Sequence, residues 1–376
     1  SSSSAAADVY KRQASNCVSI APKETELGRK RAIDQSACNK DFTCIEGFCP
    51  SFVTVHGAEP RKPKSATHAA REIPFPDLPD APVAESAVPY SIVIAGVGGT
   101  GVVTISALLA MAAHMMEKGV TVLDMAGLAQ KNGAVFSHVR VCDDPDKLHA
   151  VRIAAGGANA MLGCDMVTSC SYESLSKLQA GRTRAVINGQ KTMTADFTRD
   201  PDLNFPERRL HKAIHLAVDG VETAPDDTQV EFIEATALAR DLMGDTIGAN
   251  LFLVGYALQK GLLPLTVSAL HAAIELNGVA PEFNKRALLW GRRAAHDTAA
   301  LRAVLGTTTH PTLPTPEASR DDDMAFVERR EADLTAYHNA AYAKTYSDLI
   351  AEVAVAEEAV APGTTALRET VAKALY

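Results

Sequence analysis

Four cysteines crowd the first fifty residues and form the clearest chemistry-bearing set in the sequence. Cys38, Cys44 and Cys49 follow a C-x5-C-x4-C spacing, Cys17 lies upstream, and Pro50 follows the last cysteine. Four thiolates can bind zinc or an iron–sulfur cluster. Zinc ribbons favour paired C-x2-C knuckles, which are absent here, whereas a Pro after the last cysteine is typical of bacterial ferredoxin runs. We therefore predict an iron–sulfur site, with zinc or ordinary buried or free cysteines as alternatives.

A glycine-rich turn is the second candidate site. Gly96, Gly98 and Gly101 satisfy the pattern G-x-G-x-x-G, and Gly99 lies between them. The turn follows a buried apolar strand and precedes a long apolar helix, as in a dinucleotide-binding fold. A second strand then ends at Asp124, where such a fold places its ribose-binding acid.

This pattern supports two interpretations. The backbone N–H groups and the dipole at a helix N-terminus suit a pyrophosphate, so the turn is a candidate for binding NAD or FAD. The alternative is that any tight strand-to-helix turn needs glycine where backbone crosses backbone. The pattern alone leaves both open.

A polar loop bounded by glycines comes next. Gln130, Lys131 and Asn132 lie beyond a predicted strand end, which is where α/β sheets place ligands. They are candidates for facing an active site or a domain interface. The alternative is that they only form caps and turns in the loop. The strand after them, Val135–Val141, alternates in polarity, and we expect its His138 and Arg140 to be surface or interface residues.

The remaining pattern describes the elements that hold these sites. Cys164–Cys170 and Ala185–Asn188 are interpreted as further short strands. From residue 234 the pattern is helical, and Gly244, Gly261 and Gly278 mark helix C-termini. The sequence therefore predicts an α/β domain with a Rossmann-like, mostly parallel sheet and a helical C-terminal part. A small cysteine-rich cluster segment precedes it, and an all-helical segment follows it.

The domain boundaries follow from composition. Seven prolines fall between residues 58 and 89, which disfavours helix and favours extended chain. Both ends of the sequence suggest a fragment of a longer protein. The expected organisation is a non-native scar (1–13), an iron–sulfur segment (14–57), a Pro-rich linker (58–89), an α/β domain (90–306), a second linker (307–323) and a truncated helical domain (324–376).

Bulk properties exclude some classes of function. The 376 residues are 47% hydrophobic and 22% charged, with a formal net charge of −8. The negative charge argues against nucleic acid and anionic membranes as partners. No run approaches the ~20 apolar residues of a membrane span, and no secretion signal is present. Clustered cysteines without such a signal fit a reducing compartment, so we expect a cytoplasmic protein.

Three segments together resemble one family, the 2-oxoacid:ferredoxin oxidoreductases, and within it the fused indolepyruvate ferredoxin oxidoreductases. Residues 24–55, which hold the last three clustered cysteines, resemble its cluster segment. Residues 96–104 and 123–140 resemble its gamma-type domain, the pyruvate/ketoisovalerate oxidoreductase domain. Residues 249–265, continuing to 287, resemble the helical end of that domain, and the region after Asp323 resembles the start of the family's C-terminal domain.

The resemblance implies an enzyme that decarboxylates a 2-oxoacid with thiamine diphosphate and Mg²⁺, passes electrons through [4Fe-4S] clusters to ferredoxin, and transfers the acyl group to coenzyme A. The family's thiamine signature is absent here, which implies that the thiamine site lies in domains outside this chain. Those domains, ferredoxin and a small-molecule 2-oxoacid are the implied partners, within a homo-oligomer. Cys17, Cys38, Cys44 and Cys49 either complete one cluster or share two.

The resemblance also changes the interpretation of the glycine turn. Gamma-type domains carry this turn without a known dinucleotide, so a coenzyme A phosphate or a contact with the thiamine domains becomes its alternative use. Two other functions stay open: a NAD(P)- or flavin-dependent reductase that uses Gly96–Gly101, and a non-catalytic docking scaffold. No residue pattern assigns an acid or base.

Overall fold

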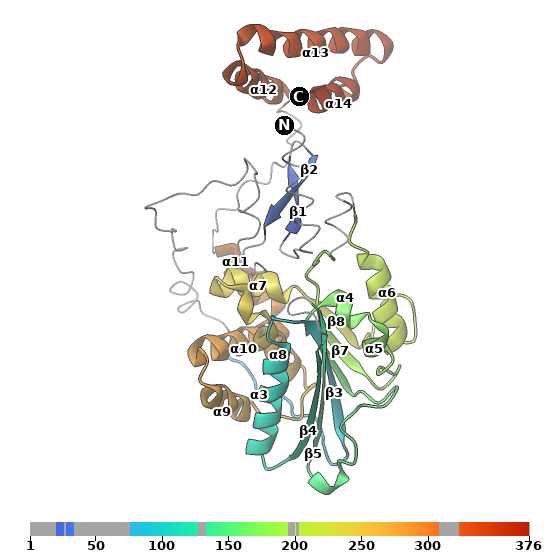
Figure 1. Cartoon of the computed structure of the whole chain (residues 1–376), viewed down its shortest axis with the longest axis vertical. Helices are drawn as coiled ribbons and strands as arrows, with labels where there is room; N and C mark the ends of the chain where they lie inside the picture. Colours follow the sequence, from blue (N-terminus) through green and yellow to red (C-terminus); the bar gives the residue numbers. More distant parts are fainter. Residues whose placement is uncertain are drawn as a thin grey trace. The chain divides into compact units, whose positions relative to one another are not determined.

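A computed structural model shows how the elements are arranged (Figure 1). The structure describes residues 20–25, 28–33, 76–126, 133–194, 200, 203–307 and 323–375. By its contacts the chain divides into two units. Unit 1 comprises Ser1–Ala21 and Ile33–His310, and unit 2 comprises Pro22–Ala32 and Pro311–Tyr376.

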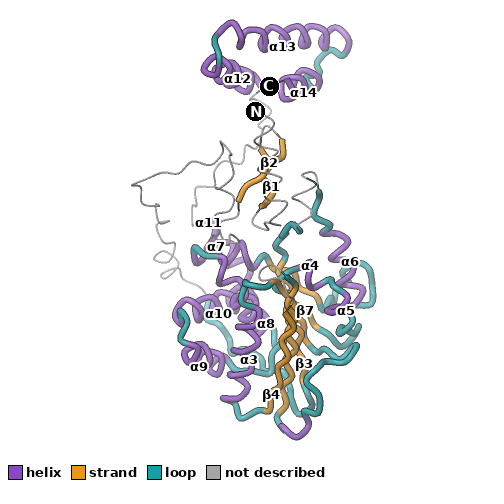
Figure 2. The backbone as a smooth tube through the Cα atoms, in the orientation of Figure 1, coloured by secondary structure: helices purple, strands orange, loops and turns teal. Residues whose placement is uncertain are grey.

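Unit 1 is built on a six-stranded sheet in the order β4-β5-β3-β6-β7-β8, and Figure 2 shows its strands side by side. The strands are β3 (Tyr90–Val97), β4 (Gly119–Ala126), β5 (Ala134–Cys142), β6 (Ala160–Gly163), β7 (Arg184–Asn188) and β8 (Val230–Ile233). Neighbours from β3 to β8 pair in parallel, whereas β5 is antiparallel to both β3 and β4. The expected α/β fold with a mostly parallel sheet is confirmed.

Helices cover both faces of this sheet, which explains the continuous apolar run in β3. Ile92 and Ile94 belong to the core under one helical layer, and Val93 and Ala95 belong to the core on the other face. A strand buried on both faces loses the alternation of a half-exposed strand. The first layer contains α3 (Val102–Met115), α7 (Ala235–Met243), α8 (Ala249–Gln259), α9 (Val267–Asn277), α10 (Pro281–His296) and α11 (Thr298–Thr307).

The second layer is smaller and contains α4 (Met166–Ser169), α5 (Tyr172–Leu175) and α6 (Glu207–Val218). The expectation of a strand over residues 164–170 was wrong. The carboxylate of Asp165 accepts the Thr168 N–H at 2.7 Å, and this cap starts a helix instead. Short 3-10 turns occur at η1 (Pro145–Lys147) and η3 (Thr246–Gly248).

Helix α8 is the centre of the first layer, and each of its residues is buried. It packs against α10 through two glycines. A Cβ atom at Gly255 would overlap the carbonyl oxygen of Leu288, and one at Gly291 would overlap that of Phe252. The two backbones therefore approach at a distance that only glycine permits.

Helix ends in this layer follow the expected signals. Thr266 caps α9 by accepting the Ala269 N–H at 3.2 Å. Gly244 and Gly278 end α7 and α9 with φ of 79° and 69°, in the left-handed region. Gly261 has φ 70° and lies just beyond α8. Among the described residues, no helix is long and apolar enough to cross a membrane.

Residues 76–89, hereafter the strap, were expected to form the end of a linker. They run as extended chain, as the prolines predict, but they are bonded along the surface of unit 1. The Gln259 side chain donates to the Pro79 carbonyl at 3.1 Å, and the Ala84 N–H donates to the Leu263 carbonyl at 3.0 Å. The described end of the linker is thus part of the domain.

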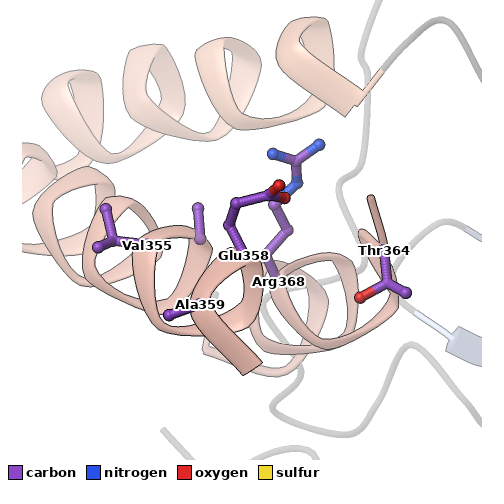
Figure 3. Close-up of a pocket in the computed structure, with 6 residues that line it drawn as sticks. Val355, Glu358, Ala359, Thr364 and Arg368 are labelled. Carbon is purple, nitrogen blue, oxygen red and sulfur yellow. The ribbon is translucent and has the colours of Figure 1, made fainter. Parts of the chain in front are cut away.

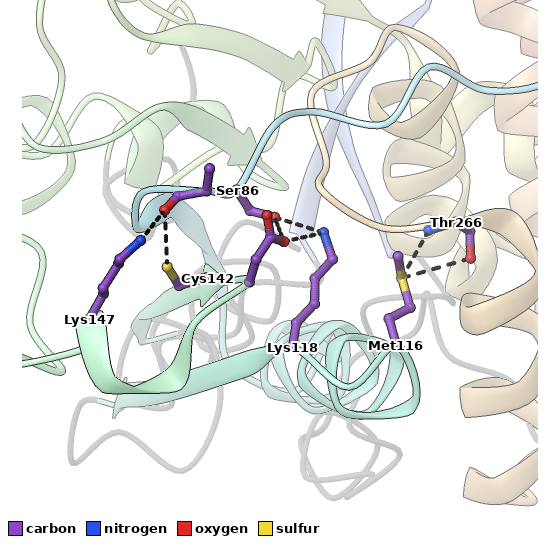
Figure 4. Close-up of polar contacts among 8 residues, drawn as sticks. Ser86, Met116, Lys118, Cys142, Lys147 and Thr266 are labelled. Carbon is purple, nitrogen blue, oxygen red and sulfur yellow. Dashed lines mark hydrogen bonds and ion pairs between the residues drawn. The ribbon is translucent and has the colours of Figure 1, made fainter.

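The end of the strap is fixed by a polar cluster in which Ser86 is buried and Asp143 is exposed (Figure 4). The Ser86 hydroxyl donates to Asp143 at 2.7 Å and accepts from Lys118 at 2.7 Å. Lys118 also forms an ion pair with Asp143 at 3.0 Å. Lys147 donates to the Ala87 carbonyl at 3.1 Å. These contacts join the strap to the ends of β4 and β5 that lie opposite the glycine turn.

A separate two-stranded sheet is formed by β1 (Ile20–Thr25) and β2 (Gly28–Ile33). The helices of unit 2 are α12 (Asp323–Tyr337), α13 (Ala340–Val360) and α14 (Ala366–Leu375). The all-helical segment expected here is divided at Asn339, which caps α13 by accepting the Tyr342 N–H at 2.9 Å. Tyr346 and Ile350 from α13 and Ala372 from α14 form the small core.

Glu357 joins α13 to α14 within this unit. Its carboxylate accepts the N–H groups of Leu367 at 2.7 Å and Arg368 at 3.0 Å, and the Thr364 hydroxyl at 3.3 Å. Although burial opposes ionisation, these hydrogen bonds hold the pKa of Glu357 below its ordinary value. A side chain of α13 thus caps the start of the next helix.

Candidate functional site

The glycine turn lies at the carboxyl edge of the sheet, between β3 and α3. The strand order also reverses here: the connection through α3 leads to β4 on one side of β3, whereas β6 pairs with β3 on the other side. In open α/β sheets, ligands usually bind at the carboxyl edge where the strand order reverses. A Cβ atom at Gly96 would lie 2.6 Å from Val102 Cγ2 and 3.0 Å from Cys164 Cβ, so packing of strand against helix requires glycine there.

The other glycines bend the backbone. Gly99 has φ 84° and Gly101 has φ 93°, and both values lie in the left-handed region that favours glycine. The Gly98 N–H donates to the Gly133 carbonyl at 2.8 Å. The Thr100 hydroxyl donates to the carbonyl of residue 97 at 2.7 Å. The turn is therefore fixed by its own backbone and by the residue that precedes β5.

A contact from α8 completes this arrangement. Asn250 Nδ2 donates to the Thr100 carbonyl at 2.7 Å. That carbonyl lies just before the N-cap, Gly101, and outside the helix. The first intrahelical bond of α3 joins the Ile105 N–H to the Gly101 carbonyl at 3.1 Å.

The start of α3 consequently presents free hydrogen-bond donors. The N-cap, Gly101, has no side chain, and the N–H groups of Val102, Val103 and Thr104 have no acceptor within the described part of the chain. Unpaired N–H groups at the start of a helix carry about half a unit of positive charge. The turn is therefore able to bind an anionic group such as a phosphate.

Asp124, the candidate ribose-binding acid, has another role. Its Oδ1 accepts the Ser106 hydroxyl from α3 at 2.8 Å and also accepts the Ser137 hydroxyl from β5. Both serines are fully buried. One carboxylate oxygen therefore joins β4, α3 and β5, which is a sufficient structural reason for an acid at the end of this strand.

Most of the other predicted site residues lie outside the described part of the chain. This applies to Gln130, Lys131 and Asn132, although the residues on either side, Ala126 and Gly133, lie at the edge of the sheet that carries the glycine turn. The candidate metal ligands, Cys17, Cys38, Cys44 and Cys49, likewise lie outside the described residues.

The three described cysteines do not form a metal site. Cys142 and Cys164 are buried, and Cys170 is partly buried. Burial, with a smaller contribution from Asp165, raises the pKa of Cys164 and of Cys170 to about 12, so both remain thiols at neutral pH. Throughout the described ranges, no group of three or more His, Cys, Asp or Glu side chains is arranged to hold a metal.

His138 was expected at a surface or an interface, and this expectation was wrong. The side chain is fully buried, because the chain around Ile153 packs over that face of β5. His138 Nδ1 accepts the Ile153 N–H at 3.1 Å, and Nε2 has no partner among the described residues. Burial and, to a smaller extent, Lys177 lower the pKa of His138 to about 4. It is a neutral core residue at physiological pH.

Arg140, two residues further along β5, was also expected at a surface or an interface, and it is half-buried. Its Nε donates to the Ser91 hydroxyl at 3.3 Å, and its guanidinium also donates to the Ala150 carbonyl at 2.5 Å. These bonds join β5 to β3 and to the chain that covers His138. The described contacts of Arg140 are thus structural.

A polar group at the ends of β7 and β8 was missed by the sequence interpretation. The Asn188 amide donates to the Thr236 hydroxyl at 2.8 Å and to the Cys164 carbonyl at 3.2 Å. The Glu234 carboxylate lies over Gly189, where a Cβ atom would overlap it. Burial raises the pKa of Glu234. The turn signal after Asn188 was the available clue, because it too marks the carboxyl end of a strand.

An open hollow lies on unit 2, and its lining includes none of the predicted site residues. It is lined by Ala354, Val355, Glu358, Ala359, Thr364 and Arg368, and Figure 3 shows the Glu358 and Arg368 side chains next to each other. The Glu358 carboxylate accepts the Gly363 N–H at 3.2 Å. Small apolar side chains with one acidic and one basic residue do not define a reaction centre.

Comparison with known families agrees with the sheet and the turn. Residues 91–294 match the family described as pyruvate ferredoxin/flavodoxin oxidoreductase, and these residues include β3 to β8 and the glycine turn. The chain belongs to this family. Residues 324–376, which include α12 to α14, match a family of unknown function (DUF6537).

Similar proteins are subunits of oxidoreductases. The chain is 25% identical over 211 residues to the indolepyruvate oxidoreductase subunit IorB of Archaeoglobus fulgidus, across 54% of this chain and 94% of that protein. It is 28% identical over 216 residues to IorB of Pyrococcus horikoshii, across 55% of this chain and 96% of that protein. A solved structure, the gamma subunit of a keto/oxoacid ferredoxin oxidoreductase from Geobacter sulfurreducens, superposes with a TM-score of 0.37 at 18% identity, covering 55% of this chain and 98% of that one.

Proposed function

We propose that this chain is the gamma-type part of an indolepyruvate, or arylpyruvate, ferredoxin oxidoreductase. The observation that carries the proposal is the match of residues 91–294 to an oxidoreductase family, together with relatives named as indolepyruvate oxidoreductase subunits that the chain covers almost completely. In the proposed reaction a 2-oxoacid loses CO₂, its acyl group forms a thioester with coenzyme A, and the two electrons released reduce ferredoxin.

The domain organisation of the proposal follows the sequence boundaries. Thiamine diphosphate and Mg²⁺ would be held by domains outside this chain. Within it, Cys17, Cys38, Cys44 and Cys49 of the segment 14–57 would hold a [4Fe-4S] cluster, and this assignment rests on their spacing. The α/β domain would extend over 90–306, and the truncated helical domain over 324–376.

The glycine turn is proposed to bind a phosphate of coenzyme A. The support is physical: free N–H groups at the start of α3, a backbone bent by Gly99 and Gly101, and a position at the carboxyl edge of the sheet. Gly96 and Gly98 shape the same turn. Gln130, Lys131 and Asn132 would contribute polar side chains from the loop between β4 and β5. A contact with the thiamine-binding domains is the other use of this surface.

The proposal places the enzyme in the cytoplasm, in a homo-oligomer that includes the thiamine-binding domains. The test uses that complete assembly, purified without oxygen. Indolepyruvate, phenylpyruvate, pyruvate and 2-oxoglutarate are supplied with coenzyme A, and ferredoxin reduction is followed by absorbance. We expect arylpyruvates to give the highest kcat/KM. Absence of ferredoxin reduction with all four acids would refute the proposal, and a preference for pyruvate or 2-oxoglutarate would refute its indolepyruvate part.

Two further measurements address the competing functions. Calorimetric titration with NAD(H), NADP(H) and flavins tests the reductase alternative, which the free N–H groups of the turn would also serve. Binding of any of them at micromolar concentration would favour that alternative. Replacing Cys44 by Ser in the assembly tests the scaffold alternative. An unchanged rate of ferredoxin reduction would show that this chain carries no electrons.

A further inference from the structure

Asn250 is the only polar side chain among the described residues that reaches the glycine turn from another helix. Its amide donates to the Thr100 carbonyl at 2.7 Å, across 150 positions of sequence. Asn250 is only 8% exposed. Thr100 is exposed, so the bond is part-buried and the Asn250 amide is its buried partner.

The acceptor is the backbone carbonyl of the residue just before the N-cap of α3. The N–H groups of Val102, Val103 and Thr104 follow the N-cap Gly101 and have no intrahelical acceptor, because the first intrahelical bond begins at Ile105. The Thr100 carbonyl lies between two residues in the left-handed region, Gly99 and Gly101. Glycine tolerates many conformations, so a bond to the residue between them selects one.

The donor is held by a fully buried helix of unit 1. Asn250 lies in the first turn of α8, each residue of which is buried. Gly255 lets this helix pack directly on the backbone of α10. The position of the amide is therefore set by the core, and the turn takes its position from the amide.

We infer that Asn250 is a positioning residue for the glycine turn, holding the free N–H groups of α3 in the geometry that a phosphate of coenzyme A requires. This inference rests on the function proposed for the turn. Asn250 itself does not contact the ligand in this arrangement. Its effect is to keep the binding conformation populated before the phosphate arrives, which lowers the cost of ordering on binding.

The test compares Asn250→Leu with a matched control, Asn284→Leu. Asn284, on α10, makes the same type of bond, from its amide to the Val279 carbonyl at 2.8 Å, but this bond is exposed and joins residues only five positions apart. In the complete assembly we expect Asn250→Leu to raise the KM for coenzyme A by about tenfold with kcat little changed. Asn284→Leu should leave both constants as in the unaltered enzyme.

Pantetheine, which has the thiol of coenzyme A but none of its phosphates, separates positioning from a general loss of structure. If Asn250 acts through a phosphate, Asn250→Leu and the unaltered enzyme should use pantetheine equally well. An equal loss with pantetheine and with coenzyme A would overturn the inference, because it would show a non-specific defect. An unchanged KM for coenzyme A would also overturn it and would leave the proposed reaction intact.

A readout independent of activity covers the case in which the proposed function fails. Amide hydrogen exchange of Gly98 and Ile105, whose N–H groups donate to Gly133 and Gly101, reports the order of the turn. We expect faster exchange at both amides in Asn250→Leu and not in Asn284→Leu. Unchanged exchange would refute positioning by Asn250, whatever the substrate of the enzyme.

Discussion

The backbone of Gly291 on α10 lies directly against the carbonyl oxygen of Phe252 on α8, and a Cβ atom at position 291 would overlap that oxygen. The same Cβ would lie 2.8 Å from the Tyr256 backbone nitrogen. Both neighbours are helix backbone atoms, which cannot turn aside as a flexible side chain can. The close packing of α8 against α10 thus depends on the absence of one methyl group.

Replacing Gly291 by Ala should therefore destabilise unit 1. Gly to Ala in an ordinary helix raises stability by about 0.5–1 kcal/mol. Here the helices must separate, and we expect a loss of about 1–3 kcal/mol. The chain's single tryptophan, Trp290, is buried in this unit, so its fluorescence during urea unfolding gives the free energy directly. An increase in stability would show that the helices separate at no cost.

His138 should make the stability of unit 1 depend on pH. Its pKa is lowered to about 4 in the folded chain from 6.5, so between these values the unfolded state binds the additional proton. Stability is complete above pH 6.5 and decreases as the pH falls toward 4. The dependence of the unfolding free energy on pH should be weaker in His138→Asn, in which the shorter amide can still accept the Ile153 N–H. Trp290 fluorescence at a series of pH values measures it, and an identical slope in both proteins would contradict this assignment.

Glu357 should have the corresponding effect on unit 2. Its pKa is below the ordinary value in the folded chain, so its contribution is present above the pKa of the unfolded carboxyl and is lost as the pH falls through the folded pKa. Glu357→Gln removes the charge at the start of α14, and we expect faster amide exchange at Leu367 and Arg368. The neighbouring Glu358→Gln is the control, because that carboxylate accepts the Gly363 N–H and does not bond to the first turn of α14 in the described structure. Equal effects of the two changes would argue against a cap by Glu357.

Ser86→Ala should loosen the strap. Ser86 is 2% exposed, and its loss leaves Lys118 and Asp143 to pair without their shared hydroxyl. We expect a loss of about 1–2 kcal/mol and faster exchange of the Asp143 N–H, which donates to the Ser86 carbonyl at 2.8 Å. Ser176→Ala is a suitable control, because its hydroxyl only makes a local bond to Glu173. Unchanged exchange at Asp143 would show that the backbone alone holds the strap.

Local signals predicted much of this fold. The glycines that end α7 and α9 and the Thr266 cap act within one helical turn, so they can be identified without knowledge of the rest of the chain. The same holds for β3, whose apolar run indicates a strand buried on both faces. The glycine turn was placed correctly between strand and helix for the same reason.

Contacts between distant segments could not be predicted in this way. His138 was assigned to a wet face because its strand alternates, but the chain near Ile153 covers that face. The strap has the composition of a linker, and its bonds to Leu263 and Asp143 depend on tertiary structure. Asn250 gave no signal at all, because an isolated Asn in an apolar helix is not distinctive until Thr100 is placed beside it.

The sheet order has a consequence for synthesis of the chain on the ribosome. Strand β3 is made first among the six, yet it lies in the middle of the sheet between β5 and β6. One of its faces is closed by helices that include α8, whose residues are translated about 150 codons after the glycine turn. Nascent chains that end before α8 therefore expose apolar sheet surface, and such surface favours aggregation and chaperone binding until the final helices emerge.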